Sequence, residues 1–224
     1  ILKSMGERPV TIRTLDPPLH EFLPHEEEEI SALSSRISLS EEELREKIAS
    51  LKELNPMLGH RGCRLGIVYP EITRMQVEAI FEAACDLVEE GMKPSPEIMI
   101  PLVGSLEEFE QQEEVVRETA ERVQESRGCR VEYLDGTMIE IPRAALTAGR
   151  IAGKAEFFSF GTNDLTQTTF GISRDDAGKF MAEYLDKGIW PADPFQKLDV
   201  EGVGELIKTG VGKGRETRKD LKIG

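Results

Sequence analysis

The sequence predicts an α/β fold with a parallel sheet, and two observations carry this prediction. Short apolar runs alternate along the 224 residues with longer stretches whose apolar residues recur at helical spacing. This alternation is typical of strand-and-helix units around a parallel sheet, and about five such units can be traced. Each predicted strand also ends at polar or glycine-rich residues, and α/β proteins bind their ligands at that end of the strands.

The predicted strands are apolar runs that end at polar residues, glycine or proline. They cover residues 9–14, 64–68, 97–103, 131–141 with an interruption at 135–136, and 157–160. In the first strand Val10 and Ile12 alternate with Thr11 and Arg13, which is the period-two pattern of a strand with one apolar face.

The predicted helices are longer stretches with an apolar residue every three or four positions. They cover about 40–54, 71–90, 105–126, a stretch from 143, and 200–214. Two of them begin with a capping-box pattern, Ser40 with Glu43 and Ser105 with Glu108. The run 210–214 has part of the composition of a phosphate-binding loop but lacks its spacing, so we interpret it as a flexible helix end.

The composition excludes several classes of protein. The chain has 28 basic and 42 acidic residues, which gives a formal net charge of −14. Nucleic acids and anionic membranes are bound through clustered Lys and Arg, so neither is an expected partner. Hydrophobic residues make up 39% of the chain, which supports a packed core, and no apolar run approaches the ~18 residues of a membrane span. Anion binding therefore has to depend on a local group of arginines.

The three cysteines are widely spaced, and no C-x-x-C pair occurs among them. They predict neither a disulfide framework nor a zinc site. We expect Cys63 and Cys85 to be small buried thiols on strand or helix faces. A reducing cytoplasm is the expected compartment, since the first residues also lack a signal-peptide pattern.

Polar side chains gather after the predicted strands, where a ligand is expected. They are Arg13, Asp16, His60, Arg61, Arg64, Glu140, Asn163 and Asp164. Guanidinium groups match carboxylate and phosphate oxygens in pairs, and carboxylates with an amide oxygen suit Mg²⁺. Together they predict a site for a phosphorylated carboxylate held partly through a metal. Singly, each has an ordinary alternative: a strand-end arginine is often a salt-bridge partner, and Glu140 has Arg143 nearby in the sequence.

Four segments also carry a resemblance to a known family. They are 9–24 (PVTIRTLDPPLHEFLP), 55–65 (NPMLGHRGCRL), 136–146 (GTMIEIPRAAL) and 157–167 (FFSFGTNDLTQ). In these segments the chain resembles the pyruvate, phosphate dikinases. The last segment is shared with other phosphoenolpyruvate-utilising enzymes, including phosphoenolpyruvate synthase and enzyme I of the sugar phosphotransferase system, whereas the first favours the dikinases.

The resemblance implies a phosphoenolpyruvate/pyruvate-binding domain with an (α/β)₈ TIM-barrel fold, here incomplete and missing strands at both ends. Residues 1–224 would form this one partial domain. In the intact enzyme, an ATP-binding domain and a swinging phosphohistidine domain complete the conversion of ATP, pyruvate and phosphate into AMP, phosphoenolpyruvate and diphosphate. The family also implies a homodimer.

The resemblance further assigns roles by motif. Arg13 and Arg61 would clamp the phosphoryl and carboxylate groups, Glu140 and Asp164 would ligate Mg²⁺, and Gly161, Thr162 and Asn163 would contact pyruvate or phosphoenolpyruvate. The family's proton donor is the cysteine of a Cys-Gly-Glu motif, expected just beyond Gly224. We therefore assign no catalytic residue within the chain and expect the isolated chain to be inactive.

Some questions stay open at the level of sequence. Arg174 is a candidate for a phosphoryl contact, and Arg64 is interpreted as a brace for its loop. The alternatives to a dikinase fragment are a phosphoenolpyruvate synthase domain and a noncatalytic module for dimerisation.

Overall fold

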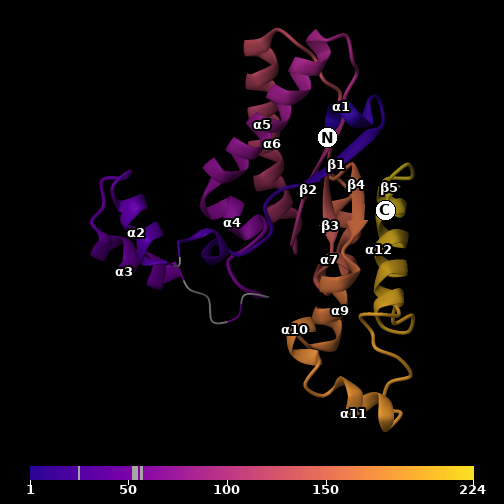
Figure 1. The fold of residues 1–224 in the computed structure, drawn as a ribbon. Helices are drawn as coiled ribbons and strands as arrows, with labels where there is room; N and C mark the ends of the chain where they lie inside the picture. Colours follow the sequence, from indigo (N-terminus) through magenta and orange to yellow (C-terminus); the bar gives the residue numbers. More distant parts are fainter. Residues whose placement is uncertain (25, 52–54, 56–57) are drawn as a thin grey trace.

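A computed structural model describes residues 1–24, 26–51, 55 and 58–224. Its centre is a parallel sheet of five strands in the order β1-β2-β3-β4-β5 (Figure 1). The strands are β1 (Pro9–Arg13), β2 (Ser95–Ile100), β3 (Leu134–Ile139), β4 (Phe157–Phe160) and β5 (Lys222–Ile223). The sheet curls as part of a barrel wall does, so the predicted α/β fold and its incomplete barrel are confirmed.

Helices connect and cover the strands. They are α1 (Leu2–Met5), the 3₁₀ helix η1 (Leu19–Phe22), α2 (Glu27–Ser34), α3 (Glu41–Leu51), α4 (Cys63–Val68), α5 (Pro70–Glu89), α6 (Leu106–Arg127), α7 (Pro142–Leu146), α8 (Ala148–Ile151), α9 (Thr162–Phe170), α10 (Arg174–Ala177), α11 (Met181–Asp186) and α12 (Val203–Thr217). Helices α5 and α6 pack against each other, and α12 packs along α7 and α8 (Figure 1). None of the described helices combines the length and apolar character that a membrane crossing requires.

The core lies between the sheet and these helices. Ile98 and Ile100 of β2 and Phe158 of β4 are buried in one cluster with Phe81 of α5 and Phe109 of α6. The period of two in β2 places Ile98 and Ile100 on this face and leaves the alternate positions for the other face. Burial of this apolar face orders the strands, and hence the polar residues at their ends.

The predicted helix ends are confirmed where the local chemistry is strong. The Ser105 hydroxyl accepts a hydrogen bond from the Glu108 amide at 3.2 Å, and Glu108 Oε2 accepts one from the Ser105 amide at 2.9 Å. Ser40 and Glu43 make the same reciprocal pair before α3. Gly91, which directly follows the helix predicted at 71–90, has a φ of 81° and stands just beyond the end of α5. These signals depend on neighbouring residues alone, so the sequence suffices to find them.

The strand predicted at 64–68 is wrong, because these residues form helix α4. A run this short has no period that separates strand from helix. Gly62 precedes α4 with a φ of 57°, and Leu65 and Gly66 are buried as α4 packs on α5 and α6. Tertiary packing therefore decides the conformation of this segment.

The interruption predicted at 135–136 is also wrong, since β3 runs through both residues. Gly136 pairs with Phe157 of β4, and a Cβ atom there would lie 2.4 Å from the Phe157 ring. The glycine therefore permits the close approach of an aromatic neighbour and does not mark a turn.

The flexible helix end predicted for 210–214 is a third correction. Gly210 and Gly214 lie within α12 and are buried. A Cβ atom on Gly214 would come within 2.7 Å of Leu221 and 2.8 Å of Phe158, and one on Gly210 within 3.1 Å of Phe160. The glycines let α12 pack directly on β4.

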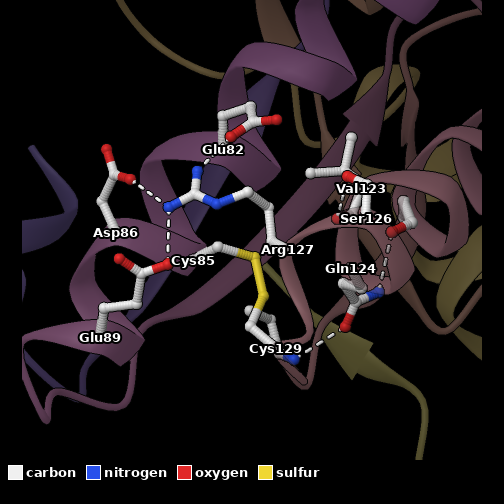
Figure 2. Close-up of a disulfide and its surroundings, with 11 residues drawn as sticks. Glu82, Cys85, Asp86, Glu89, Val123, Gln124, Ser126, Arg127 and Cys129 are labelled. Carbon is white, nitrogen blue, oxygen red and sulfur yellow. Dashed lines mark hydrogen bonds and ion pairs between the residues drawn. A yellow bond between two sulfur atoms is a disulfide. The ribbon is translucent and has the colours of Figure 1, made fainter.

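The cysteines form the fourth correction. A disulfide joins Cys85 of α5 to Cys129, which follows α6, with their Cα atoms 5.9 Å apart (Figure 2). The sequence separation of 44 residues hides this proximity, which arises because α5 and α6 pack side by side. Beside it, Arg127 forms ion pairs with three acidic side chains of α5, namely Glu82, Asp86 and Glu89. Cys63 is a free, buried thiol as predicted, and burial raises its pKa to about 12.

Candidate functional site

The carboxyl ends of the strands bring the predicted site residues to one edge of the sheet. A cavity of about 530 Å³ lies there. It is lined by Arg13, Asp16, Pro17, Pro18, Glu21, Arg61, Asn163, Asp164, Gln167, Ser173, Arg174 and Asp175. Of the seven residues given a role by motif, four line this cavity, namely Arg13, Arg61, Asn163 and Asp164, whereas Glu140, Gly161 and Thr162 are not part of its lining.

Asp16 joins the two predicted arginines on one wall of this cavity. Its Oδ2 accepts hydrogen bonds from Arg13 Nη1 at 2.9 Å and from Arg61 Nη2 at 2.7 Å. The Asp16 backbone oxygen also accepts one from Arg61 Nε at 3.1 Å. Both arginines therefore form salt bridges, which was the alternative role considered for an arginine at a strand end. Both also line the cavity.

Glu140 lies behind the cavity, directly after β3, and is fully buried. Its Oε1 accepts a hydrogen bond from the Leu102 amide at 2.6 Å, while its Oε2 has no hydrogen-bond partner among the described residues. Burial raises the pKa of Glu140 to about 8; the hydrogen bond from the Leu102 amide opposes this rise, and the nearby carboxylates of Asp164 and Asp16 contribute to it. Arg143, the alternative partner, donates instead to the carbonyl of Gly104.

Gly161 is predicted to contact substrate, but the structure gives it a different neighbour. A Cβ atom at this position would lie 2.4 Å from Glu140 Oε2 and 2.7 Å from Glu140 Cβ. Glycine therefore makes room for the buried carboxylate. Thr162, the next residue, is exposed at the first turn of α9.

The start of α9 contributes Asn163, Asp164 and Gln167 to the lining of the cavity. Asp164 Oδ1 accepts a hydrogen bond from Gln167 Nε2 at 2.8 Å, and Gln167 Oε1 accepts one from the Arg174 amide at 2.8 Å. Arg174 Nη1 also donates to Asn163 Oδ1 at 3.0 Å. Gln167 was not among the predicted residues, although its spacing of three from Asp164 on a helix was the available signal.

Leu102 is a second residue that the sequence did not reveal. Among the described residues it is the one non-glycine residue with a positive φ, at 58°. A left-handed conformation costs a residue of this kind roughly 1–2 kcal/mol. Its side chain packs directly against Gly62, where an added Cβ atom would lie 2.9 Å from Leu102 Cβ. Leu102 thus contacts the loop that carries Arg61, while its amide holds Glu140.

Arg64 has the bracing contacts expected of it. Its Nη1 donates to the carbonyl of Gly59 at 3.1 Å and to that of Leu58 at 3.4 Å. These bonds hold the loop before α4, in which Arg61 lies.

The oxygen atoms near Glu140 fit a magnesium ion. Glu140 Oε2 is buried without a donor, and the Asp164 carboxylate lies close enough to raise the pKa of Glu140. No group of three or more His, Cys, Asp and Glu side chains able to hold a metal occurs in the described ranges. Mg²⁺ is commonly bound by one or two carboxylates, with water and substrate oxygens as its other ligands. Glu140 and Asp164 are a donor pair of that kind.

Comparison with known proteins decides the family. Residues 1–219 match the family described as "PEP-utilising enzyme, PEP-binding domain". The chain belongs to this family. Pyruvate, phosphate dikinase 2 of Oryza sativa subsp. japonica is 56% identical over 226 residues, which are 100% of this chain and 26% of the relative.

Two further relatives agree with this result. Pyruvate, phosphate dikinase of Clostridium symbiosum is 56% identical over 223 residues, 99% of this chain and 26% of its own length. That of Giardia intestinalis is 54% identical over 224 residues, 100% of this chain and 25% of its own length. The chain therefore spans about a quarter of the curated relatives it matches, within a family of PEP-utilising enzymes.

Proposed function

We propose that the chain is the phosphoenolpyruvate/pyruvate-binding part of a pyruvate, phosphate dikinase, and that its strand-end cavity binds the substrate together with Mg²⁺. One observation carries this proposal. Two arginines occupy one wall of the cavity, and a carboxylate, Asp164, occupies the same cavity in front of the buried Glu140. Phosphoenolpyruvate carries a phosphoryl group and a carboxylate, which such an arrangement can hold at opposite ends.

Each group of residues would have a separate role in binding the substrate. Arg13 and Arg61 bind and orient the phosphoryl group, whose spread negative charge they neutralise. Asn163 is placed to orient the substrate from the start of α9. Mg²⁺, held by Glu140 and Asp164, would supply positive charge where the enolate oxygen develops its negative charge.

We propose that the rest of the reaction belongs to the longer enzyme. It interconverts ATP, pyruvate and phosphate with AMP, phosphoenolpyruvate and diphosphate through a phosphohistidine on another domain. We assign the cysteine proton donor that the resemblance implies to the longer enzyme as well. The relatives reported above carry the dikinase name, which favours this reaction over that of a phosphoenolpyruvate synthase.

Calorimetry with oxalate, an enolpyruvate mimic, in the presence of Mg²⁺ tests the site. We expect the chain to bind oxalate, and Arg61→Ala and Asp164→Ala each to lower its affinity at least tenfold. Arg122→Ala is the matched control, because Arg122 pairs with Glu78 in an exposed ion pair away from the cavity. Binding that neither site variant changes would contradict the proposed site.

The isolated chain is expected to be inactive as an enzyme. Purified chain mixed with ATP, pyruvate, phosphate and Mg²⁺ should yield no phosphoenolpyruvate in a coupled assay, while the oxalate binding above is retained. Formation of phosphoenolpyruvate would overturn the assignment of the phosphohistidine and the proton donor to other parts of the enzyme.

We also propose a homodimer in the cytoplasm. Leu185, Ile189, Leu198 and Val200 are exposed apolar side chains in one segment, and Ile189, Leu198 and Val200 line a cavity of about 660 Å³ beside Trp190. Exposed apolar patches often mark contacts between subunits. Light scattering tests this: a mass of one chain at micromolar concentration would exclude the dimer for this part of the enzyme.

In a reducing cytoplasm the Cys85–Cys129 bridge would be open.

A further inference from the structure

Asp16 is placed unlike any other carboxylate of the cavity. It is 4% exposed, and it lies three residues after Arg13 and immediately before two prolines. Through Oδ2 it accepts from Arg13 and Arg61, and through its backbone oxygen it accepts from Arg61 Nε and from the Gly62 amide at 3.3 Å. One residue thus contacts both arginines and the loop that carries the second.

These bonds fix the plane of the Arg61 guanidinium. Nε and Nη2 form one edge of the planar group, and Asp16 accepts from both. The donors of Nη1 and the second donor of Nη2 are left for a ligand. Arg61 is only 15% exposed, so its remaining freedom is small once this edge is held.

The charge of Asp16 explains how the two arginines can converge. Two guanidinium groups that approach one point repel each other, and the repulsion is strong where water is excluded. The Oδ2 atom between them offsets this repulsion. Without it, we expect Arg13, whose side chain is 42% exposed, to turn toward solvent.

We propose that Asp16 is a positioning residue that holds Arg13 and Arg61 in the orientation needed to bind the substrate's anionic group. This inference rests on the proposed function. Asp16 acts through the arginines and remains in place when the ligand binds, because it is buried and its backbone is held by Gly62 and followed by Pro17. If the Asp16 carboxylate occupied the position of the ligand, it would have to move away from the two arginines when the ligand binds. Asp16 instead bonds to one edge of the Arg61 guanidinium and leaves the other edge for the ligand.

Two substitutions test the proposal by calorimetry with oxalate and Mg²⁺. Asp16→Ala should lower the affinity at least tenfold, although it removes a negative charge from an anion site. Asp16→Asn should lower it less, about threefold, because its carbonyl can replace Oδ2. Since Oδ1 has no hydrogen-bond partner, the amide group of asparagine removes no existing bond, and the Asn variant should fold. Affinity equal to or higher than that of the unmodified chain in both variants would overturn the proposal.

The matched control is Glu156→Gln. Glu156 also accepts from a guanidinium, that of Arg117, and from a backbone amide, that of Asp135, at the opposite edge of the sheet. Its variant should bind oxalate as the unmodified chain does. In a chain that already carries Arg13→Ala and Arg61→Ala, adding Asp16→Ala should cause no further loss, because a positioning residue has nothing left to position.

A second measurement does not need the ligand. NMR relaxation of the Arg61 Nε–H group should report a rigid side chain in the unmodified chain and a mobile one in Asp16→Ala. If the unmodified chain binds no oxalate but Arg61 loosens in the variant, the proposed function fails and the positioning role stands. If Arg61 stays equally rigid without the Asp16 carboxylate, the positioning role is wrong.

Discussion

At the scale of the residue, the strand-end edge contains buried carboxylates whose hydrogen bonding is incomplete. Glu140 Oε2 and Asp16 Oδ1 have no hydrogen-bond partner in the part of the chain that the structure describes, and both residues are almost completely buried. Such atoms weaken a fold, since buried polar groups are normally hydrogen-bonded. Their presence at the end where α/β proteins bind ligands is consistent with a role in binding.

Gly161→Ala is expected to damage both the fold and the site. The added methyl group would meet Glu140 Oε2 at 2.4 Å and Glu140 Cβ at 2.7 Å, in a region that cannot relax freely. We expect a loss of roughly 1–3 kcal/mol in stability, measured by thermal denaturation, and weaker oxalate binding with Mg²⁺. Gly178→Ala is the control, because a Cβ atom there has no neighbour within 4 Å. Wild-type stability in Gly161→Ala would mean that Glu140 moves without cost.

The ionisation of Asp135 should make the stability of the folded chain depend on pH. Burial raises the pKa of Asp135 to about 7, and this outweighs the Arg117 guanidinium 3.3 Å away, which acts in the other direction. The folded state therefore binds the proton more tightly than the unfolded state, whose Asp pKa is about 4. The resulting stability is present below pH ~4 and is lost as the pH rises toward ~7.

Asp135→Asn should remove this dependence. In urea titrations the unmodified chain should lose stability between pH ~4 and ~7, and the variant should lose less and be more stable at pH 8 by roughly 1–3 kcal/mol. Asp186→Asn, an exposed site at the end of α11, should leave the profile unchanged. Parallel profiles for Asp135→Asn and the unmodified chain would contradict the assignment.

At the scale of the element, local patterns were sufficient for some segments and not for others. The caps of α3 and α6 and the strands β1, β2 and β4 follow from neighbouring residues. Residues 64–68 carry too short a pattern, and β5, with only Lys222 and Ile223, is defined solely by its pairing with β4. The arginine and carboxylate motifs predicted polar residues that do gather at the strand ends. Leu102 could not be found, because its role depends on a contact with Glu140 in a distant segment, whereas Gln167 had a local signal in its spacing from Asp164.

Helix α12 offers a paired test within one element. Gly214→Ala should destabilise the chain by roughly 1–3 kcal/mol, because its methyl group would lie within 2.8 Å of Phe158 and closer still to Leu221. Gly212→Ala in the same helix has no neighbour within 4 Å, so it should stabilise the chain by up to ~1 kcal/mol through helix propensity. Equal effects in thermal denaturation would mean that α12 does not depend on close packing.

At the scale of the whole molecule, a curled sheet of five parallel strands supports a strongly acidic protein in which three arginines gather at one cavity. Arg13, Arg61 and Arg174 line this cavity together with four acidic side chains, so the cavity carries no excess of positive charge. The net charge of −14 repels anions at long range, and anion binding therefore depends on close contacts with the arginines, which salt screens less than the long-range repulsion.

The disulfide between α5 and the segment after α6 acts on the fold as a whole. It closes a loop with a sequence separation of 44, so its loss in oxidised protein should cost roughly 2–4 kcal/mol. Cys85→Ser should lower the thermal midpoint in air-oxidised buffer and have less effect with excess dithiothreitol. Thiol titration of the unfolded, oxidised chain should detect Cys63 alone. Three free thiols after oxidation would show that the bridge does not form.

The left-handed backbone at Leu102 has a consequence for how the cavity can change. Its amide holds Glu140, its carbonyl accepts from the Cys63 thiol, and its side chain lies against Gly62 beside Arg61. Glu140, behind the cavity, and the loop that carries Arg61 are therefore connected through one residue. Substitutions at Glu140 and in this loop should be epistatic, so that changes on the two sides of Leu102 have to evolve together.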